Sequence, residues 1–170
     1  MNASTAAPIL HLEKLAGRAD LPGRAQDGLV LTNGCFDLLH EGHVRFLEGC
    51  AALGDRLVVG LNDDAAVTEL KGPGRPAVPV AQRAALLAAI RWVDAVVVFG
   101  EATADGLIRK IQPDIYAKGA DYDPAAGGIE LPEAASARAV GARLEYIGLV
   151  AGSSTTALLN RLRESPEPAN

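Results

Sequence analysis

Two histidines stand three positions apart in the segment TNGCFDLLHEGH, which covers residues 32–43. The segment follows a β-branched and leucine-rich run at 28–34 and leads into a stretch with helical spacing at 43–53. The free backbone N–H groups and the dipole of a helix start favour an anion. Imidazoles placed there can donate hydrogen bonds to phosphate oxygens, with charge assistance when they are protonated. His40 and His43 therefore predict a phosphate-type anion site at a helix N-terminus.

Other roles for the two histidines have to be weighed. Cys35 and Asp37 lie close by in the sequence, but the spacing is neither that of a zinc finger nor H-E-x-x-H, so no protein-ligated metal is expected. A purely structural reading would make His40 a cap and His43 a packed side chain. The glycine-bearing, strand-to-helix setting favours a ligand instead. Walker A and G-x-G-x-x-G patterns are absent, which disfavours an ordinary NTPase or a dinucleotide dehydrogenase.

Short apolar runs alternate with helix-like segments along the chain, and this order must position the histidines. The alternation predicts an α/β fold: a doubly wound, Rossmann-like, five-stranded parallel sheet with helices on both faces. In such a sheet, ligands bind beyond the carboxyl ends of the strands. The expected strands are 28–34, 56–61, 93–99, 114–119 and 143–148, and the expected helices are 9–19, 43–53, 63–70, 81–90, 104–111, 132–141 and 154–163.

Composition narrows the class of protein further. The 170 residues carry a net charge of -5, which gives no basic surface for nucleic acid, and no apolar stretch approaches a membrane span. Two cysteines make no disulfide framework, and no signal peptide is evident, so a cytoplasmic protein is expected. The predicted organisation is an N-terminal helical extension (1–28), one catalytic domain (29–163) and a flexible tail (164–170).

Three sequence blocks carry a family resemblance. NGCFDLLHEGH contains H-x-G-H, RWVDAVV at 91–97 is similar to R-Y-V-D-E-V, and GSSTTALL at 152–159 is similar to I-S-T-T. In this order the blocks resemble the H-x-G-H nucleotidyltransferase superfamily, which includes cytidylyltransferases and adenylyltransferases.

Two further segments narrow the resemblance to one group. LKGPGRP at 70–76 fits L-K-G-x-x-R-P, and AKGADY at 117–122 fits V-K-G-G-D-Y with departures at Ala117 and Ala120. The group is the D-glycero-β-D-manno-heptose 1-phosphate adenylyltransferases, the nucleotidyltransferase half of ADP-heptose synthase. The segment LVAG before the third block lacks the arginine found in glycerol-phosphate cytidylyltransferases, which disfavours CTP as donor.

The resemblance implies transfer of AMP from ATP to a sugar 1-phosphate, and it assigns roles to residues of this chain. Catalytic residues would be His40, His43 and Lys71. Nucleotide-binding residues would be Asn33, Gly34, Cys35, Phe36, His40, His43, Lys118, Gly119, Asp121, Ser153, Ser154, Thr155 and Thr156. Acceptor-binding residues would be Asp37, Lys71, Arg83 and Arg91. Several of these have simpler explanations: Ser154–Thr156 as an N-cap, Gly34 as a tight turn, and the lysine and arginines as solvated charges.

The implied partners are ATP and the sugar phosphate, with Mg²⁺ bound through the ATP phosphates rather than in a protein cage. Nucleic acid and membrane are not expected, a homodimer is compatible with the sequence, and a separate sugar kinase would supply the acceptor. Two alternatives stay open. One is the same fold acting on glycerol 3-phosphate, phosphoethanolamine, FMN or another acceptor, and the other is a nucleotide-binding module without turnover.

Overall fold

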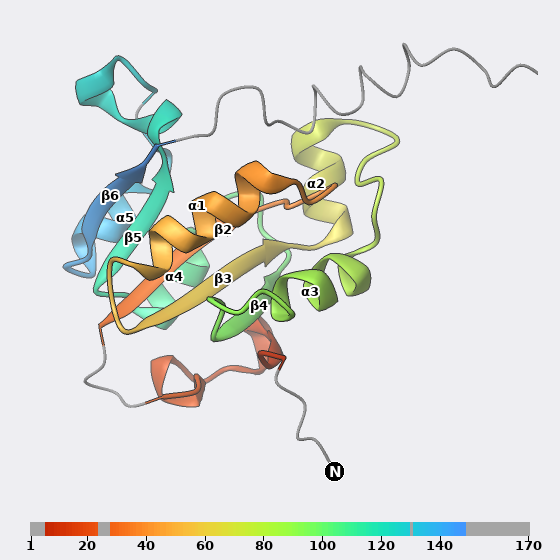
Figure 1. Cartoon of the computed structure of the whole chain (residues 1–170), viewed down its shortest axis with the longest axis horizontal. Coiled ribbons are helices and arrows are strands. Elements are labelled where there is room, and N and C mark those ends of the chain that lie inside the picture. Colours follow the sequence, from red (N-terminus) through yellow and green to blue (C-terminus); the bar gives the residue numbers. More distant parts are fainter. Residues whose placement is uncertain (1–5, 24–27, 130, 149–170) are drawn as a thin grey trace, which may run out of the picture.

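The computed structural model describes residues 6–23, 28–129 and 131–148, and these form one sheet with helices packed on it (Figure 1). All neighbouring strands are parallel, in the order β1-β4-β3-β2-β5-β6. The strands are β1 (Ile9–His11), β2 (Leu29–Gly34), β3 (Arg56–Asn62), β4 (Ala95–Phe99), β5 (Ile115–Gly119) and β6 (Arg143–Ile147). The α/β class, the parallel sheet and the predicted strand order along the chain are confirmed.

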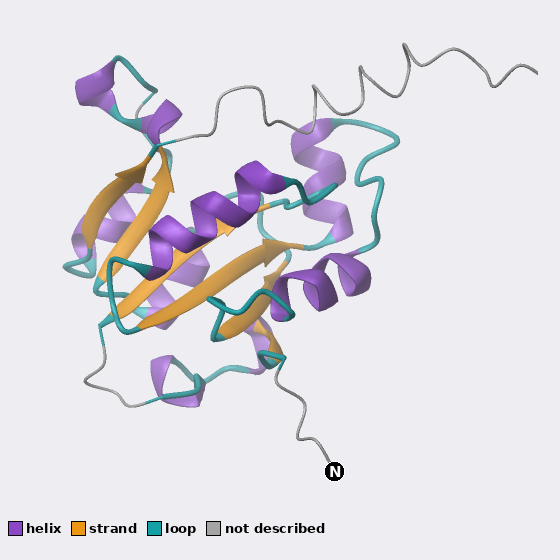
Figure 2. Cartoon of the chain, viewed as in Figure 1, coloured by secondary structure: helices purple, strands orange, loops and turns teal. Residues whose placement is uncertain are grey.

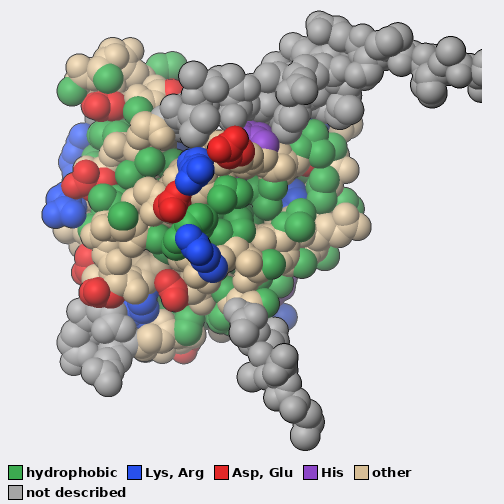
Figure 3. Space-filling model, in the orientation of Figure 1, with side chains coloured by type: hydrophobic (Ala, Val, Ile, Leu, Met, Phe, Trp, Pro, Cys, Tyr) green, Lys and Arg blue, Asp and Glu red, His purple; other side chains and the backbone are tan. Residues whose placement is uncertain are grey.

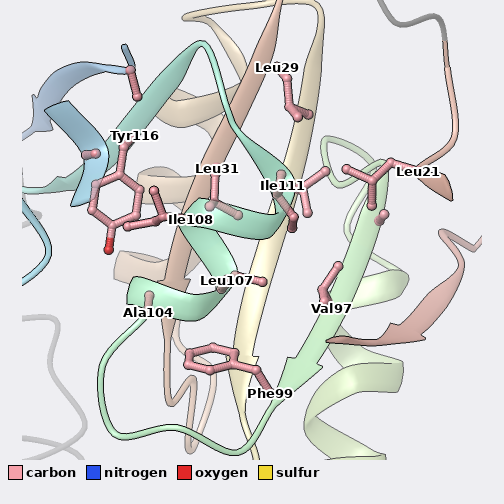
Figure 4. Packing of buried hydrophobic residues seen from close by; sticks show 14 of the residues in the cluster. Leu21, Leu29, Leu31, Val97, Phe99, Ala104, Leu107, Ile108, Ile111 and Tyr116 are labelled. Carbon is pink, nitrogen blue, oxygen red and sulfur yellow. The ribbon is translucent and has the colours of Figure 1, made fainter. Parts of the chain in front are cut away.

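Helices cover both faces of the sheet (Figure 2). They are α1 (Glu41–Ala51), α2 (Asp64–Lys71), α3 (Val80–Ala88), α4 (Asp105–Ile111) and α5 (Ala134–Ala139). Side chains of α1 and α3 pack with one set of alternating strand residues, and side chains of α4 and α5 pack with the other set. Figure 4 shows the core on the α4 and α5 face, where Leu107, Ile108 and Ile111 of α4 lie over Leu31 of β2. The arrangement is therefore doubly wound, as the sequence predicts.

The central strands owe their position to continuous burial. All seven residues of β3 and all five of β4 are buried, so neither strand shows the alternation of a half-exposed strand. Gly60 in β3 marks a close approach, because a Cβ there would lie 2.4 Å from Leu107 Cδ2 and 3.0 Å from Asn33 Cβ. The missing side chain thus makes room for both α4 and Asn33.

The structure of the N-terminal segment differs from the predicted helix. The expected helix at 9–19 is instead strand β1 followed by two 3-10 turns, η1 (Leu12–Lys14) and η2 (Arg18–Asp20). Strand β1 pairs with β4 in parallel, with Ile9 opposite Val96. The physical reason is the edge of β4, whose backbone N–H and C=O groups would otherwise lack ladder partners. The sheet therefore has six strands rather than five, and residues 9–20 are part of the fold rather than a helical extension.

The strand order reverses between β2 and β5. The chain runs from β2 outward through β3 to β4, and then returns to place β5 on the other side of β2. This point is where an open parallel sheet offers a crevice beyond its carboxyl ends. No helix among residues 6–23, 28–129 and 131–148 has the length and apolar character needed to cross a membrane. The predicted helix at 154–163 and the predicted tail at 164–170 lie outside the described residues.

Candidate functional site

His40 and His43 meet at the start of α1. His40 is the N-cap in extended conformation, and His43 donates its backbone N–H to the His40 carbonyl at 3.0 Å. Their rings stack, with centroids 3.9 Å apart and an interplanar angle of 30°, and the Phe36 ring lies 5.4 Å from His43. Both Nδ1 atoms are buried without a hydrogen-bond partner in the described part of the chain. Figure 3 shows histidine surface beside charged side chains on this face, and both His40 and His43 are only partly buried.

Burial sets the protonation state of the two imidazoles. It lowers the pKa of His40, and it lowers the pKa of His43 to about 4, with a further contribution from the neighbouring His40. Both rings are therefore neutral near pH 7 in this structure. Protonated histidines would donate charge-assisted hydrogen bonds, as the sequence led us to expect. The geometry instead offers neutral N–H donors at a helix N-terminus, unless an arriving anion raises these pKa values.

The loop between β2 and α1 has an unusual backbone. Phe36 and Leu38 have φ values of 45° and 58°, a region that non-glycine residues seldom occupy. Gly34 fits beneath the Phe36 ring, because a Cβ at that position would lie 3.2 Å from Phe36 Cε2. Such a conformation persists only where neighbouring groups hold it in place. Two side chains, Arg83 and Asp37, do this here.

Arg83 supports the site from beneath, which corrects its predicted contact with the acceptor. Its side chain is fully buried, and its guanidinium donates to the carbonyl oxygens of Cys35 at 2.6 Å, Asn62 at 2.8 Å and Val78 at 2.8 Å. A further N–H bonds the Asp64 carboxylate at 2.6 Å. The planar five-donor fork of arginine suits this task. Arg83 therefore ties the loop after β2 to the end of β3 and the start of α2.

Asp37 is also structural, contrary to its predicted role in acceptor binding. It is 3% exposed, and its carboxylate accepts from Arg75 Nε at 2.7 Å and from the backbone N–H groups of Ala77 and Val78 at 2.9 and 3.0 Å. The Arg75 guanidinium completes the ion pair at 2.6 Å. These bonds fasten the 72–79 loop to the histidine-bearing loop.

Lys71 is the last residue of α2, whereas the proline- and glycine-rich segment 71–79 predicted a position within a loop. Gly72, with a φ of 90°, follows it as the C-cap. Burial raises the pKa of the Cys35 thiol and lowers the pKa of the Lys118 ammonium. The positive charge of the exposed Lys71 side chain lowers the pKa of Cys35, which opposes the effect of burial there. It also lowers the pKa of Lys118, in the same direction as burial. Lys71 is therefore within electrostatic range of the ends of β2 and β5.

Lys118 and Asn33 face each other across the switch point. Lys118 Nζ lies 3.1 Å from Asn33 Oδ1 and 3.4 Å from the Asn33 carbonyl oxygen. The Tyr116 hydroxyl donates to the same Oδ1 at 2.5 Å. Burial lowers the pKa of Lys118, whereas the carboxylates of Glu133 and Asp121 act in the opposite direction. Gly119 ends β5 beside this group, so the predicted residues of β5 do reach the crevice edge.

Arg91 belongs to the opposite end of the sheet. It follows α3 and precedes β4, so it lies at the amino edge of the strands. Its guanidinium lies over the Trp92 ring at 4.5 Å from the centroid. Arg91 therefore lies away from the crevice beyond the carboxyl ends of the strands, and its predicted acceptor contact stays a prediction. Ser153, Ser154, Thr155 and Thr156 lie outside the described residues, and their predicted roles stay predictions.

The sequence did not identify Tyr116 and Glu133 as residues of the site. Tyr116 reads as a core residue of an apolar strand, but its i, i+2 relation to Lys118 places both on one face. Glu133 is 5% exposed and accepts the Ala104 N–H at 3.2 Å. Its charge adds to the effect of burial in raising the pKa of Tyr116, and it opposes burial at Lys118. Nothing in the local sequence signals that a glutamate at 133 approaches β5.

Fold and site together define a class of protein: a doubly wound α/β domain with imidazole and ammonium groups at its switch point, suited to a phosphate-bearing ligand. The sequence matches the Cytidylyltransferase-like family over residues 31–144. The chain belongs to that family, and the superfamily predicted from the H-x-G-H block is confirmed.

Curated relatives carry the name bifunctional protein HldE. The protein from Pseudomonas entomophila (strain L48) is 45% identical over 156 residues, which make up 92% of this chain and 32% of that protein. The protein from Azotobacter vinelandii (strain DJ / ATCC BAA-1303) is 44% identical over 158 residues, or 93% of this chain and 32% of that protein. The chain thus spans about a third of the length of the curated relatives it matches.

Solved structures agree with the fold. A lipopolysaccharide core biosynthesis protein from Thermoplasma volcanium GSS1 is 25% identical, with a TM-score of 0.57, covering 73% of this chain and 97% of that one. Pantothenate synthetase from Thermus thermophilus is 16% identical, with a TM-score of 0.54, covering 91% of this chain and 70% of that one. The second likeness concerns the fold alone.

Proposed function

We propose that this chain transfers AMP from ATP to a sugar 1-phosphate, D-glycero-β-D-manno-heptose 1-phosphate, to give ADP-heptose and pyrophosphate. An oxygen of the sugar phosphate attacks the α-phosphorus of ATP and forms the new P–O bond. The bond between the α-phosphorus and the bridging oxygen to the β-phosphate breaks, and pyrophosphate leaves with that electron pair. The attacking oxygen is already anionic, so the reaction needs no general base.

One observation carries the proposal: donors and cations converge at the switch point. The stacked His40 and His43 stand at the N-terminus of α1, while Lys118 and Lys71 approach from β5 and α2. Two polyanions must meet in this reaction, and the transition state spreads more charge over the α-phosphate. Fixed donors and positive charges near that group lower the barrier by positioning and electrostatic stabilisation.

Each side chain has a distinct part in this scheme. His40 and His43 donate N–H groups to the ATP phosphates, together with the backbone at the start of α1. Lys71 is exposed at the end of its helix, so it can reach the phosphate of the acceptor once that substrate is bound. Lys118 is held by Asn33 at the floor of the crevice and supplies a fixed positive charge.

Magnesium would enter with ATP. The described part of the chain contains no group of three or more His, Cys, Asp or Glu side chains that could hold a metal ion, and the Asp37 carboxylate is occupied by Arg75 and two backbone N–H groups. These residues fit an ion held by phosphate oxygens and water, whose chemistry would be to neutralise charge on the leaving pyrophosphate.

The choice of donor and acceptor rests on sequence similarity. The LKGPGRP block ends α2 and forms the loop fastened to Asp37, and it fits the pattern of the heptose 1-phosphate adenylyltransferases. The curated relatives named HldE match over nearly the whole chain. The absence of an arginine before the STT block favours ATP over CTP.

A panel of acceptors tests the proposal. Pyrophosphate release is measured with Mg²⁺ and ATP or CTP in the presence of heptose 1-phosphate, glucose 1-phosphate, glycerol 3-phosphate, phosphoethanolamine and FMN. We expect the highest kcat/KM with ATP and heptose 1-phosphate. A higher kcat/KM with CTP or with another acceptor would replace the proposed substrates, and nucleotide binding without release for any acceptor would indicate a module without turnover. The His40→Ala variant, prepared in the same way, controls for contaminating activity.

A further inference from the structure

Asn33 occupies the centre of the switch point on β2. It stands in register with Gly60 of β3, whose missing Cβ leaves space for the Asn33 side chain. Across the crevice, Tyr116 and Lys118 lie two positions apart on β5 and share its face with Asn33. The Asn33 side chain therefore lies between β3 and β5, at the edge of the sheet where the crevice begins.

Two donors determine how the Asn33 amide is oriented. The Lys118 ammonium has no acceptor, so the group that faces it at 3.1 Å has to be the amide oxygen. The Tyr116 hydroxyl donates to the same oxygen at 2.5 Å. Burial raises the pKa of Tyr116, so its hydroxyl is protonated near neutral pH and can donate this bond. A flipped amide would place its NH₂ group against the Lys118 ammonium, which can only donate.

The fixed oxygen leaves the NH₂ group on the other side. No residue in the described part of the chain accepts a hydrogen bond from Asn33 Nδ2. Asn33 is only partly buried, and Nδ2 is not a fully buried nitrogen without a partner, so it is open to a ligand at the end of β2. Two oriented N–H donors thus face the space beyond the carboxyl ends of β2 and β5, where His40, His43 and Lys71 also approach.

We infer that Tyr116 is a positioning residue, which together with Lys118 holds the Asn33 amide with its NH₂ group directed at an anionic oxygen of the bound substrates. The part of this inference that concerns substrates rests on the proposed function. Tyr116 touches no substrate in this scheme, because its side chain is fully buried among Leu31, Ile108 and their neighbours (Figure 4). It acts through a single hydrogen bond.

The experiment compares two substitutions. Tyr116→Phe keeps the ring and removes only the hydroxyl, so the Asn33 oxygen retains one of its two donors. Asn33→Asp keeps an acceptor for Tyr116 and Lys118 but replaces the NH₂ donor with a second carboxylate oxygen, which repels phosphate. We expect kcat/KM to fall about tenfold for Tyr116→Phe, the scale of one hydrogen bond, and at least a hundredfold for Asn33→Asp. Ile108→Val trims the same buried cluster and leaves the hydrogen bond to Asn33 in place, and it is the control for a change in core packing.

Side-chain amide NMR supplies a readout that does not depend on turnover. The Asn33 NH₂ signals are identified by their loss in Asn33→Asp, and the wild-type protein is titrated with Mg²⁺–ATP and with inorganic phosphate. We expect these signals to shift on titration, and to change in the unliganded Tyr116→Phe protein but not in Ile108→Val. Unshifted Asn33 signals would overturn the inference even if the enzyme turns over. Shifted signals in a protein that releases no pyrophosphate would retain the inference and refute the proposed function. A Tyr116→Phe protein with wild-type kcat/KM and unchanged Asn33 signals would make Tyr116 a core residue only.

Discussion

Replacing Arg83 with leucine should destabilise the whole domain, although the residue was first expected to bind substrate. The guanidinium is fully buried and donates to the carbonyl oxygens of Cys35, Asn62 and Val78 and to the Asp64 carboxylate. Leucine would leave three backbone oxygens without these donors. Removing one partner from a buried charged network typically costs about 3–5 kcal/mol, and the half-exposed Asp64 keeps the estimate at the lower end of that range. For a domain of this size, 3 kcal/mol corresponds to a fall in Tm of roughly 6–12 °C.

The assay is urea unfolding followed by far-UV circular dichroism, with Arg91→Leu as the matched control. Arg91 is exposed and stacks only on Trp92, so its loss should change the free energy of unfolding by no more than about 1 kcal/mol. An Arg83→Leu protein within 1 kcal/mol of wild type would refute the structural role. If that protein also showed a raised KM for the acceptor, the original assignment as a phosphate contact would be restored.

Three further predictions concern the histidines and Lys71. His40→Ala should lower turnover about a hundredfold or more while the protein stays folded, because it removes one fixed donor to the phosphates; near-wild-type kcat in steady-state assays would exclude that role. Lys71→Ala should change the free energy of unfolding by no more than roughly 0.5 kcal/mol and yet lower kcat strongly, with a smaller effect on ATP binding; melting and kinetics on one preparation decide it, and unchanged kinetics would make Lys71 an ordinary surface lysine. Because the pKa of His43 falls from 6.5 to about 4 on folding, the unfolded state binds the extra proton between these values. The stability due to the neutral ring is therefore complete above pH 6.5 and is lost as the pH falls towards 4, by at most about 1.4 kcal/mol per pH unit. Urea unfolding at pH 7 and pH 5 should show this loss in wild type and a smaller one in His43→Gln, and equal losses would contradict the burial of His43.

Much of the fold follows from local pattern. Apart from Arg56 and Asp94, the runs at 56–61 and 93–99 are apolar, as expected for strands buried on both faces, and the structure places strands at 56–62 and 95–99. The helix predicted for 9–19 was wrong because this segment forms a three-residue strand, and that strand depends on pairing with β4, which is distant in sequence. The exposed edge of β4 accepts Ile9–His11, and no local propensity reports an edge that needs covering.

The candidate site was predictable where the residues follow strand ends. Asn33 and Lys118 lie at the ends of β2 and β5, and the histidines stand at the start of α1, which follows β2, so sheet topology brings these residues to one edge. Sheet topology does not show which arginines lie in the site. Arg83 lies on a helix whose burial depends on which carbonyl oxygens the β2 loop and β3 present, and Arg91 lies at the wrong end of the sheet although a family block contains it.

Asp37 shows a second limit of sequence reasoning. A carboxylate between a phosphate-binding loop and a histidine pair invites a role in substrate binding. The structure gives its oxygens to Arg75 and to the N–H groups of Ala77 and Val78, 38 to 41 positions away. Contacts over that range are set by how the 72–79 loop folds back, which no spacing rule predicts.

Direct detection of the product tests the central claim. The wild-type protein is incubated with Mg²⁺, ATP and D-glycero-β-D-manno-heptose 1-phosphate, and ³¹P NMR follows the phosphorus signals. The account predicts that the signals of ATP and the sugar phosphate are replaced by those of a diphosphate-linked nucleotide sugar and pyrophosphate in equal amounts, and that this exchange is lost in His40→Ala. Persistence of both substrate signals with active, folded protein, or release of ADP and inorganic phosphate instead, would contradict it.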